Sequence, residues 1–148
     1  NTYEDIARVG ATLAVTAGGV EVDQSKDKNV KNLMMVPDFA TGLAAVQSGR
    51  ADAYALTAIS IGQLVEKVGP DGGVERAIPF TFVSSAGNVE KGHGGFGFRK
   101  QDTALLAAFN KHMSTFIGSK EHLDIVKPFG FGQTELPTKT TAQLCAGN

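Results

Sequence analysis

The stretch 37–63, PDFATGLAAVQSGRADAYALTAISIGQ, constrains this chain most, because it predicts a helix, a turn, a buried strand and the start of a second helix. Asp38 is a typical helix N-cap, and apolar residues follow it at roughly helical spacing. Gly49 can adopt the left-handed conformation that ends a helix. The apolar run 53–56 suits a short strand that is buried on both faces.

Strand and helix patterns alternate three times before residue 74. We expect strands at 12–16, 31–36 and 53–56, and helices at 3–7, 20–28, 38–48 and 58–68. Such short intervals are typical of βαβ units with right-handed crossovers, which build a parallel sheet covered by helices on both faces. The predicted fold class is therefore α/β.

The pattern changes after Val74. We expect an extended segment at 75–83, a polar loop at 84–93, a Gly-rich strand at 94–99, helices at 102–117 and 121–126, a turn at 128–132, and a polar tail with one helical turn near 142–144. Glycine within a strand marks a bend or a close backbone approach, so the strand at 94–99 would be a crossing or hinge segment.

Composition excludes several classes of function. A net charge of −1 over 148 residues argues against nucleic acid as a partner, because nucleic-acid binding needs a basic face. No apolar run approaches the ~18 residues of a membrane span. No signal peptide is visible in the polar opening NTYED, and a mature secreted protein would look the same.

The sequence holds no pattern for catalysis, metal binding or cofactor binding. His93, His112 and His122 are scattered and have no cysteine cluster beside them, and the lone Cys145 cannot form an internal disulfide. No nucleophile elbow, phosphate loop or complete dinucleotide fingerprint occurs. We therefore expect no catalytic residue, no metal ion and no cofactor.

What remains is a candidate binding edge, because ligands of open α/β sheets bind beyond the carboxyl ends of the strands. The turn Gly18-Gly19-Val20 follows the first strand and begins a helix, so its amides and the helix dipole favour an anion such as a carboxylate. The alternative is a plain tight turn. Glu21 is either a first-turn partner of the helix dipole or a ligand for a cationic group.

Three further residues stand at the ends of the second and third strands. Asp38 is either a helix cap alone or a cap beside the ligand, and Phe39 is either core or an aromatic wall of the site. Thr57 could cap the next helix, bind the ligand, or do both. All of these residues are predicted to share one edge of the sheet.

The series AVTAGGVE, VPDFATGLAAVQSGRADAYALTAIS, ERAIPF and GGFGFRKQDTALLAAFNKHM resembles the extracellular solute-binding proteins of the amino-acid family, which capture solutes for ABC importers. The segments SGRADAYALTAIS and PFGF…ELPTKTTAQLC look most like the ectoine- and hydroxyectoine-binding branch. The resemblance implies a type II periplasmic-binding fold, in which two α/β lobes close on a ligand. It places this protein in the periplasm or outside the cell.

The resemblance also implies a division of the chain. Residues 1–99 match the second lobe, with an antiparallel return strand near 94–99; residues 100–132 match helices that return to the first lobe, and 133–148 form a polar tail. The first lobe, which supplies an Arg and aromatic residues to the site, has no counterpart here. The apolar stripe of 103–126 would then be exposed in a monomer, which favours a homodimer or segment exchange.

Carried over residue by residue, Gly18-Gly19-Val20 corresponds to the Gly-Thr-Thr-like turn that binds the ligand carboxylate in this family, and here only backbone donors remain. Thr57 lies where amino-acid binders carry an acid for the α-ammonium group. The absence of an acidic side chain at this position argues against an ordinary α-amino acid as the ligand. It favours a delocalised cation such as an ectoine-type ring, on which Phe39 could stack.

The function that this resemblance implies is capture of a small solute without chemistry, followed by docking of the closed form on an ABC permease in the membrane. One alternative is an enzyme on the same scaffold, similar to a cyclohexadienyl dehydratase, for which Glu21 and Asp38 are the candidate general acids. Another is a ligand-sensing receptor module.

Overall fold

Three short parallel strands form the sheet of the N-terminal part of the chain: β1 (Leu13–Thr16), β2 (Leu33–Val36) and β3 (Ala53–Ala55). The computed structural model describes residues 2–89 and 92–146. The strand order is β2-β1-β3, and Leu13 pairs with Leu33 on one side and with Ala53 on the other. The parallel sheet predicted from the alternating pattern is therefore confirmed.

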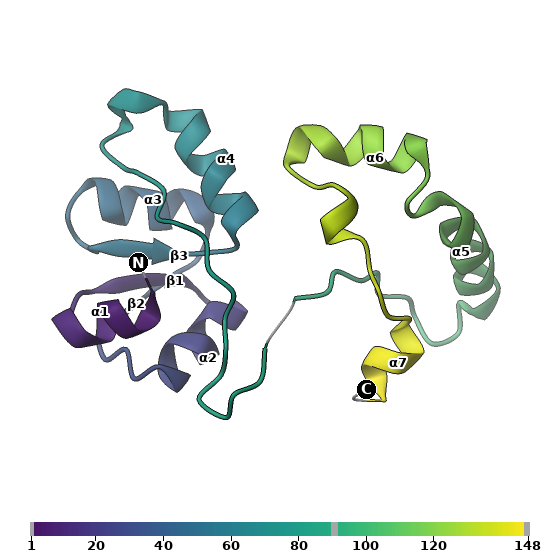
Figure 1. The fold of residues 1–148 in the computed structure, drawn as a ribbon, viewed down its shortest axis with the longest axis horizontal. Helices are drawn as coiled ribbons and strands as arrows, with labels where there is room; N and C mark the ends of the chain where they lie inside the picture. The colour runs from purple at the N-terminus through teal and green to yellow at the C-terminus, as the bar shows by residue number, and fades with distance from the viewer. Residues whose placement is uncertain (1, 90–91, 147–148) are drawn as a thin grey trace. The chain divides into compact units, whose positions relative to one another are not determined.

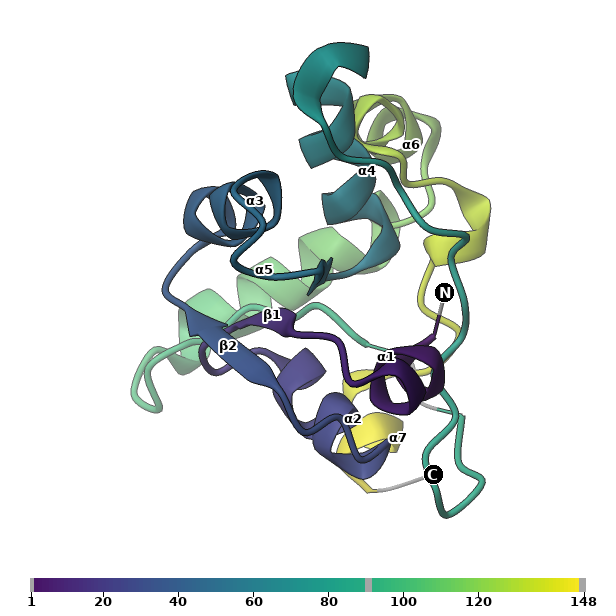
Figure 2. The same cartoon turned by 90° about the vertical axis from the view of Figure 1, so that its left-hand side faces the viewer.

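The chain divides into two units, residues 1–91 and 92–148. The helices of the first unit are α1 (Tyr3–Val9), α2 (Val20–Asp27), α3 (Phe39–Gln47) and α4 (Ala58–Val68), with a 3-10 turn η1 (Pro70–Gly72). Figures 1 and 2 show α1 and α2 on one side of the sheet and α3 on the other. Helices on both faces were expected for right-handed crossovers of a parallel sheet.

The two faces of β1 belong to two different cores, because successive side chains of a strand point to opposite faces. Leu13 and Val15 pack with Tyr3, Val30 and Phe82 under α1 and α2. On the opposite face, Ala14 packs with Val36, Ala45 and Ala51 under α3. The edge strand β3 is only half-buried, so the prediction of a strand buried on both faces is wrong there. Its outer edge has no neighbouring strand in the described sheet.

Side-chain caps begin α1, α3 and α4, including those predicted at Asp38 and Thr57. The Thr2 hydroxyl accepts a hydrogen bond from the Asp5 amide at 3.3 Å, and the Asp5 carboxylate accepts one from the Thr2 amide, which completes a capping box. Asp38 and Thr57 cap α3 and α4 by accepting a hydrogen bond from the amide three residues later, without the reciprocal bond of a capping box. The left-handed Gly49, with φ of +71°, follows the end of α3 as predicted.

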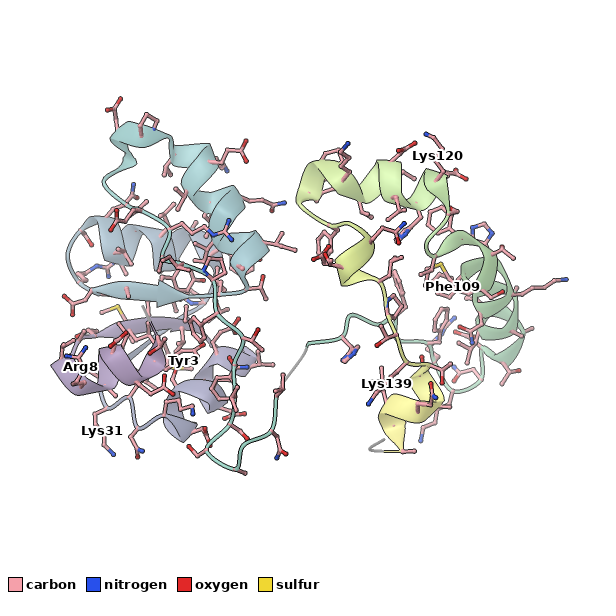
Figure 3. The ribbon with its side chains drawn as sticks, viewed as in Figure 1. Tyr3, Arg8, Lys31, Phe109, Lys120 and Lys139 are labelled. Atoms are coloured by element: carbon pink, nitrogen blue, oxygen red, sulfur yellow. The ribbon has the colours of Figure 1, made fainter. Side chains whose placement is uncertain are left out.

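Tyr3 organises the core below the sheet (Figure 3). Its side chain is buried, with 7% of the residue exposed, and its ring packs edge-on against Phe80 and Phe82 at centroid distances of 5.6 and 5.9 Å. The hydroxyl donates to Gln24 Oε1 at 3.2 Å. Burial, together with the negative charge of Glu21, raises the pKa of Tyr3 to about 12. The irregular segment 75–82 is thereby attached to α1 and α2.

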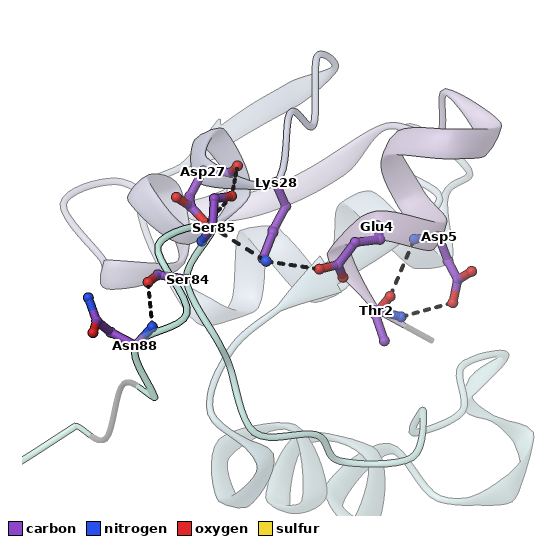
Figure 4. Close-up of polar contacts among 8 residues, drawn as sticks. All are labelled: Thr2, Glu4, Asp5, Asp27, Lys28, Ser84, Ser85 and Asn88. Carbon is purple, nitrogen blue, oxygen red and sulfur yellow. Dashed lines mark hydrogen bonds and ion pairs between the residues drawn. The ribbon is translucent and has the colours of Figure 1, made fainter.

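Polar contacts hold the next loop on the same side of the unit (Figure 4). The Ser85 amide donates to Asp27 Oδ2 at 2.7 Å, and the Ser85 hydroxyl donates to the Asp27 carbonyl oxygen at 3.0 Å. Lys28 forms an ion pair with Glu4 at 3.1 Å and lies 5.5 Å from the Phe82 ring centroid. An isolated antiparallel bridge joins Val83 to Val89. Within residues 84–89, the predicted polar loop is thus attached to α2 through Ser85 and Asp27.

The second unit contains α5 (Thr103–Phe116), α6 (Lys120–Val126), the 3-10 turns η2 (Lys127–Phe129) and η3 (Gln133–Glu135), and α7 (Thr141–Cys145). These elements confirm the helices predicted near 102–117, 121–126 and 142–144. No described residue of this unit is buried, and apolar side chains of α5 such as Leu105 and Leu106 are exposed.

The strand predicted at 94–99 is wrong, because this segment is irregular and pairs with no strand in the described part of the chain. Phe96 and Phe98 both pack on Phe109 of α5, at ring-centroid distances of 5.0 and 5.2 Å (Figure 3 labels Phe109). The Phe residues of this alternating pattern therefore contact a helix and do not form part of a strand. Asp102 stands at the N-cap of α5, but its carboxylate accepts a hydrogen bond from Arg99 Nε at 2.6 Å and caps no backbone amide.

Candidate functional site

The ends of the three parallel strands bring most of the predicted residues to one edge of the sheet. β1 ends at Thr16, β2 at Val36 and β3 at Ala55, and each strand leads within a few residues into α2, α3 or α4. Because the strands are parallel, these three helix N-termini lie at the same edge. We call residues 16–21, 37–41, 54 and 56–57 the carboxyl edge.

In the first turn of the carboxyl edge, part of the backbone is already hydrogen-bonded within the protein. Gly18 has a φ of +78°, which favours glycine, and the Gly19 amide donates to the Thr16 carbonyl oxygen at 3.0 Å. The amides of Val20 and Glu21 have no acceptor within α2, as at any helix start. The turn therefore offers fewer backbone donors to an anion than the sequence suggested.

Glu21 lies against this turn. Only 8% of the residue is exposed, and a Cβ built on Gly19 would lie 2.7 Å from Glu21 Oε2. Gly19 thus leaves the room that the carboxylate occupies. A negative charge in the first turn interacts favourably with the helix dipole, and it also repels an incoming carboxylate. The side chain of Val20 is exposed and packs in neither core.

Asp38 and Phe39 begin α3. The Asp38 carboxylate accepts a hydrogen bond from the Thr41 amide at 2.8 Å, and the hydrogen bonds from Thr41 hold the pKa of Asp38 below its ordinary value. Asp38 is thus a cap that stays charged and exposed. Phe39 is 47% exposed, so the interpretation of Phe39 as a core residue is wrong, and its ring is open to a ligand.

Thr57 is the N-cap of α4 and is exposed. Its hydroxyl accepts from the Ser60 amide at 3.4 Å and donates to the Ser60 hydroxyl at 3.0 Å. The cap is therefore formed, and the hydroxyl oxygen keeps one more lone pair for a partner.

Two residues that sequence reasoning missed complete the edge. The hydroxyls of Thr16 and Tyr54 are joined by a hydrogen bond of 2.7 Å between β1 and β3. Burial raises the pKa of Tyr54; the bond to Thr16 opposes that rise, and the charges of Glu21 and Asp38 add to it. The available signal was the single polar side chain in the run 53–56, together with the polar residue that ends the first strand.

One residue of the carboxyl edge, Val20, borders a hollow along α2. A hollow of about 410 Å³ is lined by Val20, Asp23, Gln24, Asp27 and Phe82, and a second of about 270 Å³ lies around Lys28 and Phe82. Neither hollow includes Asp38, Phe39 or Thr57. Across residues 2–89 and 92–146, no group of three or more His, Cys, Asp or Glu is placed to hold a metal ion, and no helix is long and apolar enough to cross a membrane.

Comparison with known proteins finds a similar sequence. The chain is similar to the probable amino-acid ABC transporter periplasmic-binding protein y4tE of Sinorhizobium fredii (strain NBRC 101917 / NGR234), with 30% identity over 151 residues. The alignment covers 99% of this chain and 49% of that protein, so the chain spans about half the length of its relative. No family model matches the chain, and no solved structure matches it significantly. The parallel sheet with helices on both faces is consistent with one lobe of a protein of this kind.

Proposed function

We propose that this chain belongs to the solute-binding component of an ABC importer, and that its carboxyl edge contacts a small polar solute. The proposal rests on one observation. Three parallel strands end at a single exposed edge, where three helices begin and where Asp38, Phe39 and Thr57 lie. Ligands of open α/β sheets bind at such edges. The similarity to y4tE extends along nearly the whole chain and supports this role.

In this proposal the open edge becomes a cleft when a second α/β lobe covers it, whichever chain supplies that lobe. The lobe described by residues 1–99 would hold one side of the solute, and residues 100–132 would return to the other lobe. The closed arrangement is favoured because the solute contacts both lobes only there. The closed form then docks on a membrane permease from the periplasmic or extracellular side. The same proposal includes a homodimer or a segment-exchanged dimer, in which the exposed apolar face of α5 would be covered.

The chemistry of the carboxyl edge favours a solute with a positive, delocalised charge. Glu21 and Asp38 contribute negative charge, and the exposed Phe39 ring offers a face for cation–π contact. Thr57 adds a hydroxyl acceptor but no carboxylate. An ectoine-type ring fits these features better than a compact α-ammonium group, and an amino acid is the second solute class of the proposal.

Calorimetry of the full-length product of this gene tests the proposal. We expect one solute among ectoine, hydroxyectoine and the standard amino acids to bind with a Kd of about 1 µM or tighter, corresponding to roughly −8 kcal/mol. The variant Phe39→Ala should weaken binding about tenfold through loss of the cation–π contact. The control variant Ile78→Ala removes an exposed apolar side chain outside the carboxyl edge and should leave the Kd unchanged.

Two results would count against the proposal. The first is the absence of binding to every solute of the panel by a folded protein. The second is turnover of a cyclohexadienyl substrate such as prephenate or arogenate, monitored by NMR of the substrate, which would favour the enzyme alternative.

A further inference from the structure

We propose that Tyr54 is a specificity-determining residue of the carboxyl edge, and that its hydroxyl, held by Thr16, accepts a hydrogen bond from a cationic group of the solute. This inference rests on the proposed function, because it names the part of the solute that the edge recognises.

The position of the Tyr54 ring is fixed by its surroundings. Tyr54 lies in the middle of β3 and packs with the core under α3. A Cβ on Gly42 of α3 would lie 2.4, 2.5 and 2.8 Å from three carbons of the Tyr54 ring, so the ring rests directly on the helix backbone. The close approach to α3 and the hydrogen bond to Thr16 together restrict the rotation of the ring, and a fixed ring holds its hydroxyl in one place.

The hydroxyl end of Tyr54 reaches the carboxyl edge. It bonds the Thr16 hydroxyl at 2.7 Å, and Thr16 is the last residue of the central strand, immediately before the turn 17–19. Two hydroxyls share one hydrogen bond here, so together they retain a proton and several lone pairs for another partner. Both residues are half-buried, which keeps them accessible.

The charges around this pair define the class of partner. Glu21 on α2 and Asp38 at the N-cap of α3 act electrostatically on the Tyr54 hydroxyl, and both are negative when ionised. Their negative potential disfavours an anion and favours a donor such as an amidinium or ammonium group. A hydrogen bond between such a cation and a neutral hydroxyl is stronger than one between two neutral groups.

The test measures selectivity, because a residue that only supports the fold would change stability and leave selectivity intact. Calorimetry on the full-length gene product compares ectoine, which carries an amidinium group, with pyroglutamate, a ring carboxylate of similar size without a cation. For the unsubstituted protein we expect ectoine to bind at least about tenfold more tightly than pyroglutamate, as a charged hydrogen bond implies. In Tyr54→Phe this ratio should fall about tenfold, with pyroglutamate affinity changed less than about twofold.

Two further variants keep the result interpretable. Thr16→Val removes the holding hydroxyl while the ring stays in place, and it should lower the ratio about threefold to tenfold even if Tyr54→Phe does not fold. Tyr3→Phe is the matched control, because it makes the same chemical change at the other tyrosine, whose hydroxyl bonds Gln24 in the core below the sheet. It should leave the ratio unchanged.

Each outcome decides something. If the unsubstituted protein binds no solute of the panel, the proposed function fails and this inference fails with it. If the protein binds ectoine and both Tyr54→Phe and Thr16→Val keep the unsubstituted ratio, the inference is overturned while the proposed function stands. Pyroglutamate bound as tightly as ectoine would also overturn it, because the carboxyl edge would then not recognise a cation.

Discussion

Replacing Gly42 by alanine is expected to lower the free energy of unfolding of the N-terminal unit by about 2–3 kcal/mol, the upper part of the range for an overpacked core. In most helix interiors this substitution is stabilising by ~0.5–1 kcal/mol, because glycine has the higher conformational entropy. Here the new methyl group would lie 2.4–2.8 Å from three atoms of the Tyr54 ring. The ring cannot swing away without losing its bond to Thr16 and its packing on α3. Urea denaturation measures the change.

The same experiment has an internal control and a rescue. Gly62→Ala in α4 places its methyl group 3.1 Å from the end of the flexible Arg76 side chain, so it should be neutral or stabilising by up to ~1 kcal/mol. Adding Tyr54→Ala to Gly42→Ala removes the ring and should make the glycine substitution harmless relative to Tyr54→Ala alone. A stabilising Gly42→Ala in the otherwise unsubstituted protein would show that the Tyr54 ring does not lie on this helix.

The substitution Tyr3→Ala is expected to cost about 3–5 kcal/mol, as for other large aromatic side chains removed from a core. The ring is buried among Phe80, Phe82 and the sheet, and its loss would also release the segment 75–82 from α1 and α2. Tyr3→Phe keeps the ring and loses only the bond to Gln24, so it should cost about 1 kcal/mol. Chemical denaturation at neutral pH compares the two variants.

Stability at alkaline pH tests the contribution of the Tyr3 hydroxyl separately from that of its ring. The pKa of Tyr3 is about 12 in the folded protein, above that of an unfolded chain, so the folded state binds the proton more tightly. The stability that the protonated Tyr3 hydroxyl contributes is fully present below pH ~10 and is lost as the pH rises toward 12. The stability difference between the unsubstituted protein and Tyr3→Phe should therefore shrink over this interval. A difference that is constant across it would mean that the hydroxyl is exposed to water.

Local chemistry explains why much of the fold could be predicted from the sequence. Thr2, Asp38 and Thr57 cap helices through hydrogen bonds to amides three residues away, and such interactions are visible in a short window of sequence. The alternation of apolar runs with helical patterns is likewise visible in the sequence, and it implies a parallel sheet. The segment 94–99 was mispredicted because its Phe and Gly alternation has two structural uses, and only the presence of Phe109 shows which one applies.

The candidate site was predictable only in part. Asp38, Phe39 and Thr57 follow directly from the positions of strand ends. The pair of Thr16 and Tyr54 does not, because these residues are 38 positions apart and meet only if β1 lies beside β3. The strand order β2-β1-β3 depends on tertiary packing, which no local pattern specifies. The exposure of Phe39 could not be separated from core packing by helical spacing alone.

Amide NMR of the ¹⁵N-labelled protein during titration with its solute tests most directly whether the carboxyl edge is where the solute binds. We predict the largest chemical-shift changes at the amides of Gly19, Phe39 and Thr57, while the amides of Thr12 and Asp52, at the opposite ends of β1 and β3, stay unchanged. Shifts that gather at Thr12 and Asp52, or that leave the first turns of α2, α3 and α4 unaffected, would contradict the account.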